Sequence, residues 1–147
     1  MNPSLTDLLL NEPPIVEGDI PHHLLPSSKF GLFFSMSSFD AELNKYEEMD
    51  VMTFSCFEPQ WGGGPVVRRL IFCRETKYIF QRVRKFKRAA NVHAKLFICY
   101  PGPQAYFGSA NWSPRGDFVE LMARATKKQT KELVKYYNKL WNYLCKK

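Results

Sequence analysis

Two short groups of polar residues have the types and the spacing that chemistry on a phosphate group requires. His93 and Lys95 stand two positions apart, and Ser109 and Asn111 follow further along the chain. In a two-stranded hairpin these four side chains can converge on one phosphate. Phosphoryl transfer needs positioning and charge stabilisation, which a nucleophile, a fixed cation and two short donors supply. The sequence therefore predicts a site for phosphoryl transfer.

A β-hairpin is expected to hold these side chains. The apolar segments 92–99 and 104–107 flank Tyr100-Pro-Gly-Pro103, in which the prolines and the glycine favour a turn. Because side chains two positions apart share one face of a strand, His93 and Lys95 would project together. The opposite face would be apolar and would consist of Val92, Ala94, Leu96 and Ile98.

Expected strands and helices alternate along the rest of the chain. The patterns predict strands over 30–36, 51–57, 66–73 and 118–124, and helices over 39–49, 76–90 and 127–145. Ser37 or Ser38 would cap the first helix, and Thr126 with Gln129 would form a capping box before the last. This order predicts one α/β or α+β domain over residues 29–147, a mixed β-sheet flanked by helices. Residues 1–28 contain five prolines and are predicted to form an irregular arm.

Two segments in the middle of the chain have two interpretations each. The expected helix 76–90 has an apolar stripe among many basic residues, so it would either cover the core or contact nucleic acid or anionic lipid. The glycine-rich loop 58–65 would be a flexible connector or would offer backbone N–H groups to a phosphate.

Charge is distributed unevenly along the chain. Residues 1–60 hold 2 basic and 10 acidic side chains, a net charge of −8, whereas residues 61–147 hold 19 basic and 4 acidic, a net charge of +15. A polycationic half is expected of a protein that binds a phosphate backbone, although a lysine-rich soluble surface has the same composition.

Composition also narrows the class of protein. Hydrophobic residues make up 45% of the chain, which argues against wholesale disorder. No apolar run reaches the roughly 18 residues of a membrane span. The first ten residues lack the basic start of a secretory signal, so a cytoplasmic location is expected. Four cysteines stand singly without the spacing of metal ligands, and Cys56, Cys73 and Cys99 lie in apolar runs that predict buried thiols.

His93-Ala-Lys95 followed by Gly108-Ser-Ala-Asn111 resembles the HxK(x)4D(x)6GSxN motif of the phospholipase D superfamily. Arg115 to Leu121 looks like a shortened form of the family's glutamate-bearing stretch, and the resemblance covers about residues 51–145. The chain departs from the pattern at Tyr100, where the family has aspartate, and at Phe118, where it has asparagine. The resemblance implies a phospholipase D-like fold.

The resemblance also implies roles for individual residues. His93 would attack phosphorus and form a phosphohistidine, while Lys95 and Asn111 hold the non-bridging oxygens and Ser109 assists. Glu120 would accept a hydrogen bond from the imidazole of His93. Lysine and asparagine would supply the electrostatic stabilisation, so no metal or other cofactor is expected.

In-line displacement at phosphorus also needs an acid on the side of the leaving oxygen. The chain carries one copy of the motif that contains His93, and its other histidines, His22 and His23, stand in no similar sequence. A two-fold homodimer with the active site on its axis would bring two copies of His93 together.

These observations predict a metal-independent nuclease, with DNA favoured over RNA as the partner. Expected substrate-binding residues are Arg68, Arg69, Arg84, Lys85, Arg88, Trp112 and Arg115. Trp112 would stack on a base or belong to the core. One alternative is a catalytically silent nucleic-acid-binding protein, suggested by Tyr100 and Phe118. Another is a phospholipid phosphodiesterase whose basic helix lies on an anionic membrane.

Overall fold

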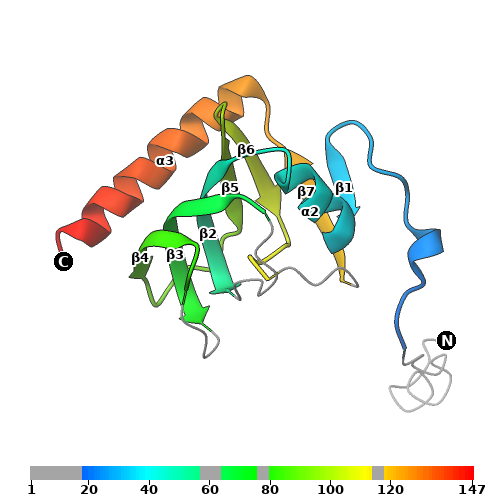
Figure 1. Cartoon of the computed structure of the whole chain (residues 1–147), viewed down its shortest axis with the longest axis horizontal. Helices are drawn as coiled ribbons and strands as arrows, with labels where there is room; N and C mark the ends of the chain where they lie inside the picture. Colours follow the sequence, from blue (N-terminus) through cyan, green and yellow to red (C-terminus); the bar gives the residue numbers. More distant parts are fainter. Residues whose placement is uncertain (1–17, 57–63, 76–79, 114–117) are drawn as a thin grey trace, which may run out of the picture.

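The chain folds around a seven-stranded mixed β-sheet with the strand order β1-β7-β6-β5-β2-β3-β4 (Figure 1). A computed structural model describes residues 18–56, 64–75, 80–113 and 118–147. Two α-helices and one short 3-10 helix accompany the sheet within these ranges. In chain order the elements are η1 (His22–Leu24), β1 (Leu32–Ser35), α2 (Met36–Leu43), β2 (Glu48–Cys56), β3 (Val66–Glu75), β4 (Val83–Arg88), β5 (Leu96–Tyr100), β6 (Gln104–Gly108), β7 (Val119–Arg124) and α3 (Lys127–Cys145).

The sheet is parallel on one side of β2 and antiparallel on the other. β2 pairs with β3 and β3 with β4 in parallel, whereas β2–β5, β5–β6, β6–β7 and β7–β1 are antiparallel. The β5–β6 hairpin around Tyr100–Pro103 was predicted and is present. The α+β class and the mixed sheet with flanking helices are therefore confirmed.

The two α-helices cover opposite faces of the sheet. Val51, Leu70 and Phe97 belong to a core that includes Phe39 of α2. Their sequence neighbours on the same strands, among them Met52 and Ile71, belong to a second core with Tyr137 and Trp141 of α3. Alternate strand residues point to opposite faces, so one sheet separates two apolar layers. Cys56, Cys73 and Cys99 are buried free thiols, as predicted, whereas Cys145 is exposed.

Helix caps explain where the α-helices begin. α3 starts after the Thr126–Gln129 capping box, as predicted. α2 starts earlier than expected, because Ser35 is its N-cap and forms a capping box with Ser38. The prediction that Ser37 or Ser38 caps this helix is therefore wrong. Neither α-helix in the described ranges is long and apolar enough to cross a membrane.

The prediction of a basic helix over 76–90 is wrong in the part that the structure describes. Val83–Arg88 forms the edge strand β4, parallel to β3, with Val67 opposite Val83 and Phe72 opposite Arg88. Phe80 and Phe86 are in ring contact at 5.4 Å. The edge of β3 supplies the backbone partners that favour a strand here over a helix. Charged residues on β4 protect this sheet edge from pairing with another chain.

A buried ionic cluster attaches α2 to the strands that carry part of the candidate site. Glu42 is 3% exposed and accepts hydrogen bonds from Tyr106 of β6 and Arg124 of β7. Burial alone would raise the pKa of Glu42, but Lys45, Tyr106 and Arg124 together hold it below its ordinary value.

Candidate active site

The open end of the β5–β6 hairpin brings the two polar groups of the motif to one end of the sheet. Leu96 pairs with Phe107, so the residues before β5 and those after β6 leave the hairpin at the same end. Met52 also pairs with Leu96, which places the last residues of β2 beside them. Three adjacent strands therefore contribute their ends to one region.

His93 and Lys95 lie together, although the predicted strand 92–99 starts only at Leu96. The ammonium nitrogen of Lys95 lies 3.2 Å from Nδ1 of the exposed His93 imidazole. A lysine ammonium can only donate, so this contact makes Nδ1 the acceptor and assigns the proton of the neutral ring to Nε2. The contact therefore leaves Nε2–H as the free edge of the imidazole.

Phe54, near the end of β2, is a platform for these groups that sequence reasoning missed. Its ring centre lies 4.8 Å from that of His93, 6.0 Å from the Lys95 ammonium and 5.4 Å from the guanidinium carbon of Arg74. Cations are attracted to aromatic faces at such distances. Phe54 and Arg74 gave no separate signal, because an aromatic residue in an apolar strand normally indicates core.

Asn111 is held by the end of β2 in a defined orientation. Its Oδ1 accepts hydrogen bonds from Thr53 Oγ1 at 3.1 Å, Phe54 N–H at 3.2 Å and Ser55 N–H at 3.1 Å. Backbone N–H groups can only donate, so the oxygen of the amide must face β2. The NH₂ group is the part of the side chain that remains to donate to a ligand.

Ser109 and Glu120 form a separate contact across β6 and β7. The Ser109 hydroxyl donates to Oε2 of Glu120 and accepts from the Leu121 N–H at 2.8 Å. In the described part of the chain the polar contact of Glu120 is with Ser109 and that of His93 is with Lys95, so the implied hydrogen bond from His93 to Glu120 is not formed. Gly108 allows the close approach of the strands, because a Cβ there would lie 2.1 Å from the Leu121 carbonyl oxygen.

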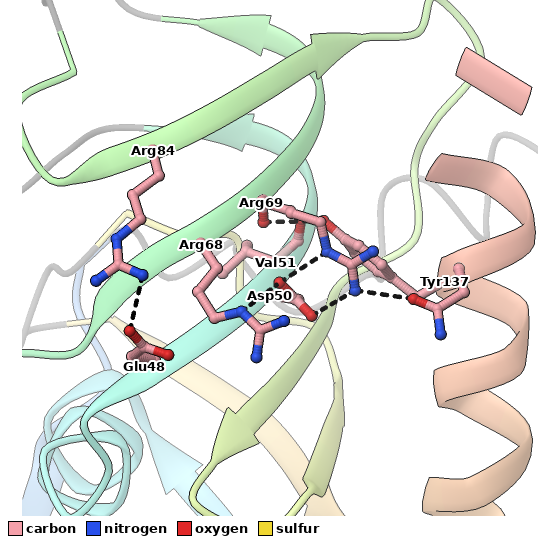
Figure 2. Close-up of polar contacts among 8 residues, drawn as sticks. Glu48, Asp50, Val51, Arg68, Arg69, Arg84 and Tyr137 are labelled. Atoms are coloured by element: carbon pink, nitrogen blue, oxygen red, sulfur yellow. Dashed lines mark hydrogen bonds and ion pairs between the residues drawn. The ribbon is translucent and has the colours of Figure 1, made fainter. Parts of the chain in front are cut away.

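Three predicted substrate-binding arginines are instead paired with acidic residues at the other end of β2 (Figure 2). Arg69 makes a bidentate contact with the fully buried Asp50, with distances of 3.1 Å from Nε and 2.7 Å from Nη2. Arg68 lies 3.8 Å from the same carboxylate, and Arg84 lies 2.9 Å from Glu48. Asp50 pairs with Ile98, toward the hairpin turn and away from His93. Arg69 neutralises a buried carboxylate, so its assignment to substrate binding is corrected, whereas the assignment of the half-buried Arg68 and the exposed Arg84 stays a prediction.

The remaining predicted substrate-binding residues divide between the two ends of the sheet. Lys85 pairs with Arg69 and lies at the end away from His93. Arg88 lies nearer to the end of the sheet that holds His93, and its Nε donates to the Cys73 carbonyl at 2.8 Å. Trp112 is 5% exposed and packs against Phe80, so it is a core residue and the stacking interpretation is wrong. Arg115 lies outside the described residues.

Tyr100, at the position of the family's aspartate, belongs to the Asp50 cluster. The Arg68 guanidinium lies over its ring, 4.5 Å from the centre. Burial and the neighbouring Asp50 carboxylate raise the pKa of the phenol. Tyr100 is therefore neutral at physiological pH, and the carboxylate near its phenol is that of Asp50, at the end of the sheet away from His93.

The mixed sheet with its flanking helices is a phospholipase D-like fold. Among solved structures it is similar to NucT from Helicobacter pylori, with a TM-score of 0.52 and 16% sequence identity. The similarity covers 76% of this chain and 94% of the NucT chain. At this identity the similarity establishes the fold alone. No protein-family model and no curated protein matches the sequence. In the described ranges, no three His, Cys, Asp or Glu side chains form a metal-binding group.

Proposed function

We propose that this protein is a nuclease-type phosphodiesterase and that His93 is its nucleophile. The observation that carries the proposal is the contact of Lys95 with His93 at the hairpin end, beside an Asn111 amide whose NH₂ group is free to donate. NucT, which shares the fold, is a nuclease of the phospholipase D superfamily. A nucleic-acid substrate also suits the net charge of +15 on residues 61–147.

The reaction begins with a change of partner for Lys95. When a phosphodiester binds, the Lys95 ammonium donates to one of its non-bridging oxygens instead of to His93, and the Asn111 NH₂ group donates to the other non-bridging oxygen. Nδ1 is then free to carry the ring proton, which leaves Nε2 with the lone pair that attacks phosphorus. The P–N bond forms as the P–O bond to the leaving group breaks. Water then hydrolyses the phosphohistidine and releases His93.

A proton donor for the leaving oxygen comes from a second subunit in this proposal. His22 and His23 lie in η1, on the far side of the molecule from β4 and the end of α3 (Figure 1). Val119 and Leu121 flank Glu120 on β7 and are 44% and 54% exposed. This apolar surface beside the site would be buried in a homodimer whose two-fold axis brings two copies of His93 to one phosphate.

Cleavage assays in excess EDTA test the proposal. We expect His93→Gln to abolish cleavage of DNA or RNA and to prevent trapping of a phosphohistidine, while the matched control His23→Gln leaves both unchanged. Cleavage that chelation abolishes, or that survives His93→Gln, would refute the mechanism. Sedimentation of the wild type tests the dimer, and a monomer at assay concentration would reject the shared site.

The contact between Glu120 and Ser109 favours a second candidate, a protein that binds nucleic acid without turnover. In that case His93 lacks the carboxylate that would orient it, and binding would survive His93→Gln. Detection of a phosphohistidine in the wild type would exclude this candidate. The phospholipid alternative depended on a basic helix over 76–90, and β4 takes the place of that helix.

A further inference from the structure

A cavity of about 490 Å³ opens beside the proposed nucleophile. It lies between the C-terminal half of α3 and the segment 89–94 that leads from β4 to the motif. His93 and Asn91 line one side, and Tyr136, Leu140 and Tyr143 line the other. The three α3 residues are spaced i, i+4 and i+7, so they form one face of the helix.

The two tyrosines of this cavity present their rings to solvent instead of to the core. Tyr136 is 45% exposed and Tyr143 is 57% exposed, whereas Tyr137 between them is fully buried. The Lys147 ammonium lies 4.9 Å from the Tyr143 ring centre, and Lys139 is exposed on the same helix. Exposed aromatic faces with adjacent cations are the arrangement with which proteins bind single-stranded nucleic acids.

We propose that this cavity is a nucleobase subsite, which makes single-stranded nucleic acid the substrate of the site. The inference rests on the proposed function, because a phosphodiester held at His93 carries a base one sugar away from phosphorus. That flanking base must lie near His93, and the wall of the cavity across from His93 carries two aromatic rings. Its volume falls in the range of roughly 300–1,000 Å³ that is typical of ligand sites.

The chemistry of the walls favours a nucleobase over other occupants. The tyrosine rings offer stacking surfaces, and the exposed Asn91 amide can both donate to and accept from a base edge. A base in a duplex is stacked and paired, and it must be unstacked before it can enter such a site. The subsite therefore discriminates against double-stranded substrates.

Fluorescence anisotropy with a short labelled oligonucleotide tests the subsite. We expect Tyr136→Ala and Tyr143→Ala each to weaken single-strand binding by at least about 5-fold, the lower end of measured losses for one stacked base. Tyr136→Phe and Tyr143→Phe keep the rings and should retain affinity. The matched control is Phe30→Ala, which removes an aromatic ring that is 92% exposed and near β1. Wild-type protein should bind a strand of abasic nucleotides more weakly than the normal strand, a comparison that needs no variant.

The outcomes separate the subsite from the proposed reaction. Tyrosine-dependent single-strand binding without cleavage or phosphohistidine would support the subsite and reject the nuclease. Normal cleavage with equal affinities for normal and abasic strands would reject the subsite and leave the nuclease standing. Equal losses for single strands and duplex, with a lower sedimenting mass in the tyrosine-to-alanine variants, would show a contact with a second copy and overturn the subsite.

Discussion

Asn111 offers the sharpest test, because one atom of its amide serves the fold and the other serves the proposed chemistry. Oδ1 accepts three hydrogen bonds from Thr53, Phe54 and Ser55, while the NH₂ group would hold a phosphate oxygen. Asn111→Ala removes both functions. Asn111→Asp keeps an oxygen toward β2 and replaces the donor by a second oxygen of a carboxylate.

The structure gives the size of the two effects. Each hydrogen bond contributes about 1 kcal/mol net, so the loss of three in Asn111→Ala should cost about 3 kcal/mol, or about 10 °C in Tm. Asn111→Asp retains the three acceptor contacts and should stay within about 1 kcal/mol of the wild type. Both variants should lose phosphodiesterase activity, since alanine cannot donate and a carboxylate repels the phosphate.

Urea unfolding and cleavage assays on the same preparations measure the two effects separately. Asn111→Gln, which lengthens the side chain by one methylene, is a useful third variant. Equal stability losses in the Ala and Asp variants would refute the assignment of Oδ1 to β2. Full activity in the folded Asp variant would refute the role of the NH₂ group.

Two further predictions concern the charges of the fold. Arg69→Met should lower the free energy of unfolding by about 3–5 kcal/mol at pH 7, because it removes the bidentate partner of the buried Asp50. Arg84→Met, at an exposed ion pair, should lower it by at most about 1 kcal/mol. Urea unfolding measures both changes, and equal losses would contradict the assignment of Arg69 to a buried ion pair. Burial raises the pKa of Asp40 from 3.8 to about 6, so the folded chain binds a proton more readily than the unfolded chain between about pH 4 and 6, and stability should fall as pH rises through this window. Asp40→Asn should remove this fall in stability with pH. It should stabilise the protein at pH 7 by at most about 3 kcal/mol, and solvent screening at the partly exposed side chain reduces this figure. An unchanged dependence of stability on pH in the variant would contradict the burial of Asp40.

Features whose hydrogen bonds are local were predictable from the sequence. The Thr126–Gln129 capping box and the turn at Tyr100–Pro103 depend on residues a few positions apart, and both are where the pattern indicates. The buried state of Cys56 and Cys99 follows in the same way from apolar runs. In each case interactions between residues close in the sequence are sufficient to determine the feature.

The basic segment before the motif could not be predicted in this way. Phe80, Val83 and Phe86 recur every three positions, a spacing typical of a helix face. The ladder with β3 supplies the backbone hydrogen bonds that a helix would otherwise make within the segment. Pairing with a strand that stands earlier in the sequence is a tertiary event, and it overrides the local preference.

For the candidate site, the sequence by itself determined the chemical groups and the hairpin that joins them. Lys95 beside His93, and Asn111 after the second strand, follow from spacing and turn chemistry. Only the tertiary structure decided the partners of these groups: Phe54 beneath His93, β2 against the Asn111 oxygen, and Ser109 against Glu120. It also assigned Arg69 to a buried carboxylate. The type of a charged or amide residue does not predict its interaction partner. The partner depends on which strands are adjacent in the sheet, and these strands are distant in the sequence.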